Sequence, residues 1–136
     1  MSIESEKNEY LFLFRGTDTG QDLAPAEVQQ IMTKFMAWVD SLTQQGILLG
    51  ANPLEREARM VVGRNGRVLF DGPYTESKEV VGGYFLLKLN SMDEAVELAK
   101  QHPLLEIGLT VEVRPVAALC PTMRQAKEAE LSSAAT

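Results

Sequence analysis

The sequence predicts an α+β protein built on a ferredoxin-like antiparallel sheet, with two helices on one face of that sheet. Strand and helix patterns follow in the order β-α-β-hairpin-β-α-β between residues 9 and 116. The Asn65–Gly66 pair, set between two apolar runs, supplies the positive φ angles of a tight hairpin turn. The chain of 136 residues is 45% hydrophobic and 24% charged, which suits one globular domain. We place that domain at residues 9–116 and expect residues 117–136, rich in Ala, Glu and Ser, to form a helical or partly flexible tail.

Two different apolar patterns predict the first strand and the first helix. Tyr10–Arg15 reads YLFLFR and is apolar on both alternating sets of side chains, as in a buried strand. Pro25 suits the first turn of a helix, and apolar residues then recur every three or four positions. The helix is therefore predicted over Pro25–Gln45, and Gly46 is its expected C-terminal stop.

The middle of the chain contains a second strand and the hairpin. Ile47–Leu49 begins the second strand, and a turn-rich segment follows it. Arg59–Arg64 and Val68–Phe70 lie on either side of the Asn-Gly turn and are expected to pair.

The last third of the chain repeats the strand, helix and strand order. Gly83–Leu89 is a strand with apolar residues on both faces. Ser91 and Glu94 have the spacing of a capping box that begins the second helix, and His102–Pro103 ends it. Leu109–Arg114 is the final strand.

One face of the predicted sheet has no helix to cover it. Leu11 and Leu13 point away from Phe12 and Phe14 along the first strand, and both sets are apolar. A bare apolar face of several hundred Å² is uncommon on a monomer. A second copy packed sheet to sheet would cover it, so we predict a homodimer. The alternative cover is the tail at residues 117–136, which has few apolar side chains.

Composition and charge argue against several classes of function. The net charge of −6 disfavours nucleic-acid binding, because phosphate backbones repel an acidic surface. No apolar run approaches the ~20 residues that a membrane helix needs, and the polar start of the chain does not resemble a signal peptide. We therefore expect a cytoplasmic protein without a membrane partner. The single cysteine, Cys120, excludes an internal disulfide, and neither a metal site nor a cofactor is predicted.

The most specific segment is residues 71–85, DGPYTESKEVVGGYF, which gathers polar groups between two strands. Asp71 could act as a general base at a strand end, or it could accept backbone N–H groups and fix the Gly-Pro turn. Lys78 could hold an anionic ligand, and Tyr74 and Glu76 could line the same site. Each of these also has a plain surface or packing interpretation.

Two other features of the chain have competing interpretations. Gly82–Gly83 lacks the spacing of a phosphate loop, so we interpret it as a strand glycine pair that permits close backbone approach. His102 is the single histidine of the chain. It could be a cation favoured by the end of the second helix, or it could transfer protons as a catalytic residue.

The run LFDGPYTESKEVVGGYFLLKLNSMDEAVELAKQHP, residues 69–103, resembles the YCII-related family, in particular its DGPF-type branch. Tyr74 stands where that branch usually has Phe. The resemblance implies a dimeric α+β barrel, and an association with sigma factors that hints at regulation. Some members are thought to be lyase-like enzymes with a His–Asp pair. Asp71 can stand for the acid of that pair, but the first half of this chain contains no histidine.

Three hypotheses follow for the function. The first is a small-molecule-binding homodimer whose modest, anionic ligand contacts Asp71, Tyr74, Glu76 and Lys78. The second is a cofactor-free lyase-like or proton-transfer enzyme that uses Asp71 as its base, with His102 as the other catalytic candidate. The third is a regulatory interaction module linked to a sigma factor, which needs no pocket. The sequence leaves open whether the protein is an enzyme.

Overall fold

The computed structural model describes residues 8–16, 22–63, 67–73 and 81–134, and for 67–73 it describes the backbone alone. The strands are β1 (Glu9–Arg15), β2 (Leu48–Pro53), β3 (Glu57–Val62), β4 (Arg67–Pro73), β5 (Val81–Lys88) and β6 (Thr110–Pro115). The helices are α1 (Pro25–Gln44), α2 (Met92–Ala99), the 3-10 helix η2 (Pro103–Ile107) and α3 (Pro121–Ala134).

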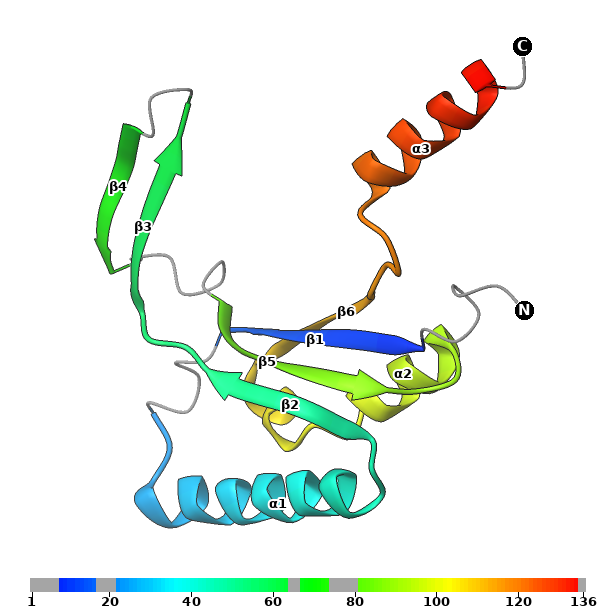
Figure 1. Cartoon of the computed structure of the whole chain (residues 1–136). Helices are drawn as coiled ribbons and strands as arrows, with labels where there is room; N and C mark the ends of the chain where they lie inside the picture. Colours follow the sequence, from blue (N-terminus) through cyan, green and yellow to red (C-terminus); the bar gives the residue numbers. More distant parts are fainter. Residues whose placement is uncertain (1–7, 17–21, 64–66, 74–80, 135–136) are drawn as a thin grey trace.

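A four-stranded antiparallel sheet forms the centre of the molecule, in the order β2-β5-β1-β6. α1 and α2 lie on the same face of this sheet (Figure 1). This is the strand order of a ferredoxin-like sheet, so the predicted fold class is confirmed. The order arises because β1 and β5, the strands with two apolar faces, occupy the central positions.

The hairpin forms a small sheet of its own, outside the four-stranded one. β3 pairs with β4 in an antiparallel register that sets Arg59 opposite Asp71. Both strands extend away from the main sheet, as an arm (Figure 1). The predicted Asn65–Gly66 turn lies outside the described residues. The sequence predicted the pairing of the two strands, but not their separation from the sheet.

The core lies between the sheet and the helices. Alternate residues of the two central strands, among them Phe12, Phe14, Phe85 and Leu87, are buried on this side. Each such side chain contributes about 1.5–3 kcal/mol through removal of apolar surface from water. Leu42 is the fully buried residue that α1 adds to them.

The helix ends follow the predicted signals with two differences. Ser91 Oγ accepts a hydrogen bond from the Glu94 N–H at 3.1 Å, as an N-cap should. The Glu94 carboxylate, however, accepts from the Asn90 N–H at 3.4 Å instead of from Ser91. α2 ends at Ala99, and His102 begins η2 instead of ending α2. α1 ends as predicted before Gly46, whose φ of 74° is the left-handed conformation that glycine favours.

The second face of the sheet carries no helix in the described part of the chain. Leu11, Leu13, Tyr84 and Leu86 alternate with the core residues of β1 and β5 and are half-buried. At the β1–β6 boundary an Arg15 guanidinium nitrogen lies 3.0 Å from a Glu112 carboxylate oxygen. The arm and α3 both extend on this side, opposite α1 (Figure 1).

α3 leaves the end of β6 and stands clear of the sheet (Figure 1). Its apolar side chains Met123 and Leu131 are 55% and 70% exposed. None of the helices in the described residues is long and apolar enough to span a membrane.

Candidate ligand-binding cavity

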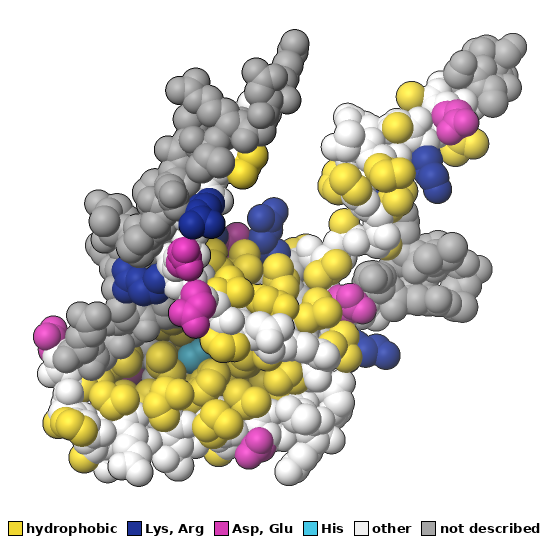
Figure 2. Space-filling view, turned by 60° about the vertical axis from the view of Figure 1, so that its left-hand side comes forward, with side chains coloured by type: hydrophobic (Ala, Val, Ile, Leu, Met, Phe, Trp, Pro, Cys, Tyr) yellow, Lys and Arg dark blue, Asp and Glu magenta, His cyan; other side chains and the backbone are white. Residues whose placement is uncertain are grey.

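A cavity of about 400 Å³ opens between α1 and the edge of the sheet where β2 and β5 meet. Figure 2 shows hydrophobic side chains gathered around a hollow on this face of the molecule, with the histidine visible inside it. A volume of this size is typical of small-molecule sites. The lining residues are Phe14, Met32, Phe35, Met36, Val39, Ala51, Asn52, Pro53, Gly82, Gly83, Tyr84, Phe85, His102, Leu104 and Leu109.

The glycine pair of β5 helps to form the cavity. A Cβ atom at Gly83 would lie 3.1 Å from the Asn52 carbonyl oxygen, too close for β2 to keep its position. The prediction of close backbone approach is thus confirmed at Gly83. Gly83 lies on the same face of β5 as Phe85, so a larger side chain at this position would also point toward the cavity.

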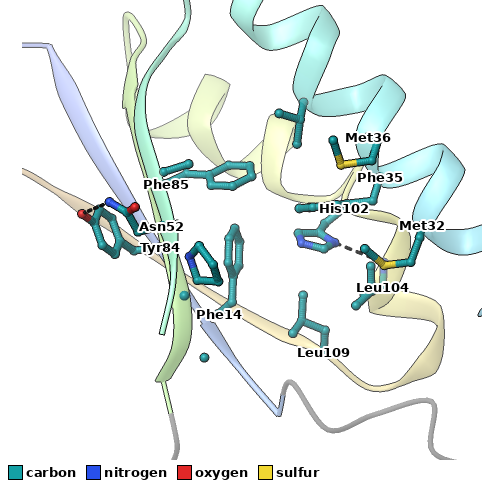
Figure 3. A pocket seen from close by; sticks show the side chains of 15 residues that line it. Phe14, Met32, Phe35, Met36, Asn52, Tyr84, Phe85, His102, Leu104 and Leu109 are labelled. Carbon is teal, nitrogen blue, oxygen red and sulfur yellow. Dashed lines mark hydrogen bonds between the residues drawn. The ribbon is translucent and has the colours of Figure 1, made fainter. Parts of the chain in front are cut away.

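Two methionines of α1 form the mouth of the cavity. Met32 and Met36 are 41% and 52% exposed, although both lie on the apolar stripe of the helix. Their unbranched side chains adapt to ligands of different shape. The mouth is therefore apolar and deformable, whereas the floor consists of rigid rings (Figure 3).

His102 lies at the inner end of the cavity and is only 4% exposed. Its imidazole is surrounded by rings, with centroids 4.9 Å from Phe14, 5.1 Å from Phe35 and 5.1 Å from Trp38. Its Nδ1 accepts a hydrogen bond from the Leu104 N–H at 3.1 Å, which caps η2 (Figure 3). This hydrogen bond and the three neighbouring rings hold the imidazole in one orientation.

Burial lowers the pKa of His102 to about 4, because desolvation disfavours the charged imidazolium. The ring is therefore neutral near pH 7. The interpretation of His102 as a cation at a helix end was wrong. The sequence shows a histidine before a proline near the end of α2, but not that three aromatic rings surround it.

The hydrogen bond from Leu104 also fixes the tautomer of the neutral ring. Because Nδ1 uses its lone pair as an acceptor, the single ring proton is on Nε2. In Figure 3 the ring edge opposite this hydrogen bond faces the space between α1 and the sheet. In this state His102 offers the cavity a hydrogen-bond donor, not a base.

Of the residues predicted to form the site, His102 is the one found among the described residues that line the cavity. Asp71 is described by its backbone alone, in the arm, where β4 pairs with β3. Tyr74, Glu76 and Lys78 lie outside the described residues. Their segment enters β5 just before Gly82 and Gly83, which line the cavity.

Sequence reasoning missed the aromatic and methionine lining. Met32, Phe35 and Met36 recur at helical spacing, and such a stripe predicts core packing whether or not a cavity adjoins it. The Asn52 Nδ2–H donates to Tyr84 Oη at 2.9 Å across β2 and β5, with both side chains on the far side of the strands from His102 (Figure 3). Trp38 Nε1 is buried and has no partner within the part of the chain that is described.

The described residues offer no metal centre, since no three His, Cys, Asp or Glu side chains among them cluster suitably. Cys120 is exposed at the start of α3, away from the residues that line the cavity. Hydrogen bonds from the backbone N–H groups of Met123 and Thr122 lower the pKa of its thiol. Among the described residues that line the cavity, His102 is therefore the candidate for polar chemistry.

Comparison with known proteins assigns the family. The family model of the YCII-related domain matches residues 9–119, and the chain belongs to this family. Among solved structures it is similar to the 5-chloro-2-hydroxyhydroquinone dehydrochlorinase of Burkholderia phenoliruptrix AC1100, in complex with 2,5-dihydroxybenzoquinone. That likeness covers 78% of this chain and 90% of the other, with 16% sequence identity and a TM-score of 0.40. No curated protein matches the chain.

Proposed function

We propose that the protein binds a small, largely apolar organic molecule in the cavity between α1 and the sheet. The observation that supports this is a 400 Å³ apolar cavity that ends on a buried, neutral histidine. Apolar cavities of roughly 150 Å³ already hold benzene, so this one has room for a molecule of one or two rings. A few polar groups at the end of an apolar pocket are typical of ligand sites.

The expected affinity is modest. An aromatic molecule that buries roughly 200 Å² gains about 5 kcal/mol at ~25 cal/mol per Å². Loss of translational freedom reduces this gain, while each hydrogen bond restores part of it. Because the net free energy stays below about 5 kcal/mol, we expect dissociation constants of roughly 0.2 mM or weaker for simple one-ring compounds.

A cavity-filling substitution tests the proposal. Met36→Trp adds bulk at the mouth, and Met123→Trp makes the same change at a similarly exposed site on α3. We expect one-ring aromatic compounds to bind the wild type and Met123→Trp equally, and Met36→Trp at least tenfold more weakly. Equal binding by both variants, or no binding to the wild type, would contradict the proposal. Failure to bind any compound would favour the sigma-factor-linked interaction module, which needs no cavity.

We further propose that the segment from Asp71 to Lys78 contributes polar contacts to the same ligand. Support comes from its connection to β5 directly beside the cavity-lining glycines. In this proposal Lys78 binds an anionic group, Asp71 orients the ligand, and Tyr74 and Glu76 complete the site. If the protein is also a lyase-like or proton-transfer enzyme, Asp71 is its candidate base, with His102 the second catalytic candidate.

Asp71→Asn tests that contribution by thermal shift with a one-ring carboxylate such as benzoate. We expect a smaller ligand-induced rise in melting temperature for Asp71→Asn than for the wild type, and a smaller rise still for Lys78→Ala. Equal shifts in all three proteins would remove the loop from the binding site while leaving the cavity proposal intact.

We also propose that the protein is a homodimer through the helix-free face of the sheet. The apolar side chains Leu11, Leu13 and Leu86 support this, as does the position of the arm and α3 beside the same face. A stable interface buries roughly 800 Å² per subunit. Sheet, arm and α3 together offer a larger apolar surface than the sheet alone.

A further inference from the structure

We infer that the cavity selects a planar ligand with an oxygen acceptor, and that the Nε2–H of His102 donates a hydrogen bond to that oxygen. The inference rests on the proposed binding function and deepens it by naming the chemical class of the ligand. It assigns His102 a binding role as a neutral donor. For Nε2 to accept a proton in the resting state, the ring proton would have to lie on Nδ1 instead.

The donor character follows from the backbone of η2. The Leu104 N–H is one of the first groups of this helix and needs an acceptor, which His102 Nδ1 provides at 3.1 Å. If the ring carried its proton on Nδ1 instead, two N–H groups would face each other at this distance. The lowered pKa removes the third state, the imidazolium, near neutral pH.

The planar shape follows from the walls around the ring. Phe14 and Phe85 contact each other edge to face, with centroids 4.8 Å apart, and Phe35 stacks over His102 at an interplanar angle of 29°. Figure 3 shows these rings bordering one space, with Met32 and Met36 opposite the sheet. Flat ligands make offset or edge contacts with such rings, while branched aliphatic ones do not.

The requirement for oxygen follows from the cost of an unpaired donor. His102 is 4% exposed, so a ligand that fills the cavity displaces the water available to Nε2. A ligand with a carbonyl or phenolic oxygen replaces the lost hydrogen bond, and a hydrocarbon of the same shape does not. Sites that hydrogen-bond a ligand in this way discriminate strongly against the analogue that lacks the polar group.

Two ligands and two variants test the inference. Acetophenone and α-methylstyrene have nearly the same shape and differ by C=O against C=CH₂. His102→Asn keeps an acceptor near the Nδ1 position for the Leu104 N–H and has no group where Nε2 lies. His102→Gln supplies a donor near Nε2 and gives up the Nδ1 acceptor. Thermal melts verify that both variants are folded.

We expect the preference for acetophenone over α-methylstyrene, measured as the ratio of dissociation constants, to fall about tenfold in His102→Asn. His102→Gln should recover part of it. An unchanged ratio in a folded His102→Asn variant would overturn the inference while the cavity proposal stands. Absence of binding by both ligands to the wild type would instead overturn the proposed function.

An independent readout is available because the chain contains one histidine. The ¹⁵N–¹H correlation spectrum of its imidazole therefore needs no assignment by mutagenesis. We expect the ring proton on Nε2 in the free protein and a shifted Nε2–H signal with acetophenone. A proton on Nδ1 would contradict the inference regardless of the binding data.

Discussion

The two faces of the central sheet are formed by the same strands but differ in what covers them. On the helix side, β1 and β5 bury Phe12, Phe85 and Leu87 and leave a cavity that ends on His102. On the other side, their alternate residues, Leu13 and Leu86 among them, are half-buried and carry no helix within the described residues. Period-two alternation thus gives one pair of strands a core with a candidate ligand cavity on one face and a candidate protein interface on the other.

Apolar character alone does not distinguish a small-molecule site from a protein interface on this sheet. Both faces carry apolar side chains, and on the helix side a cavity lies between α1 and the sheet beside Gly82 and Gly83. A concave apolar surface excludes water from a small molecule, whereas a flat one needs a large partner to bury comparable area.

Leu87 and Leu86 offer the sharpest contrast, since they are neighbours with identical side chains on opposite faces. Leu87 is 0% exposed, so Leu87→Ala should lower the free energy of unfolding by about 2–5 kcal/mol. Leu86 is half-buried in the single chain, and Leu86→Ala should cost about 1 kcal/mol at protein concentrations where the subunits separate. Urea unfolding measures both, and equal losses in dilute protein would contradict the assignment of the two faces.

A charge placed on the helix-free face of the sheet tests whether this face is the dimer interface. Leu13→Asp should raise the dissociation constant of the proposed homodimer by at least 100-fold, or about 3 kcal/mol, because an unpaired carboxylate would be buried. Val96→Asp, at a 37% exposed position on α2, is the matched control and should leave association unchanged. Light scattering reads the mass of each variant. A monomeric wild type, or a dimeric Leu13→Asp, would remove the dimer proposal.

Acidification should destabilise the helix side through His102. Its pKa is about 4 in the folded protein and 6.5 when free, so the unfolded state binds the proton first. The contribution of the neutral ring is complete above pH 6.5 and decreases as the pH falls toward 4. Phe14, Phe35 and Trp38, the rings in contact with it, are uncharged and offer no compensation.

We expect this loss to reach about 2 kcal/mol, less than the full shift implies, because the cavity admits solvent near the ring. Carboxylates titrate in the same range, so His102→Asn serves as the reference. The difference in unfolding free energy between wild type and His102→Asn should change between pH 6.5 and 4. A difference that is constant over this range would contradict the burial of a neutral histidine.

We expect the smallest loss of unfolding free energy from the ion pair of Arg15 and Glu112 on the helix-free face of the sheet. Glu112 accepts a hydrogen bond from Arg15 Nε at 3.1 Å, and both side chains are about one-third exposed. Glu112→Gln should cost no more than about 1 kcal/mol, since solvent screens partly exposed pairs. The cost should shrink further in 0.5 M salt. A salt-independent loss of several kcal/mol would mean that this edge of the face is buried in the assembly.

Much of the fold could be predicted from the sequence because its signals are local. Short runs that are apolar on both faces mark β1 and β5, Pro25 and Gly46 mark the ends of α1, and Ser91 marks the start of α2. These signals depend on backbone sterics and on unpaired backbone groups within a few residues. The direction of the arm depends on contacts between distant segments, and no local pattern encodes it.

The candidate site was harder to predict for the same reason. His102 was selected as a candidate, but its environment is made by Phe14 and Phe35, far away in sequence. The apolar stripe of α1 predicts burial, and it gives no sign that Met32 and Met36 border empty space. A cavity is a property of packing between elements, and the periodicity of one element does not report it.

Nuclear Overhauser effects to methionine methyl groups show directly whether a small aromatic molecule binds between α1 and the sheet. Met32 and Met36 line the cavity, while Met92 and Met123 are similarly exposed elsewhere. With acetophenone bound, we predict intermolecular effects from the ligand ring to the methyl groups of Met32 and Met36. Effects confined to Met92 or Met123, or absent from all four methyl groups, would contradict ligand binding in this cavity.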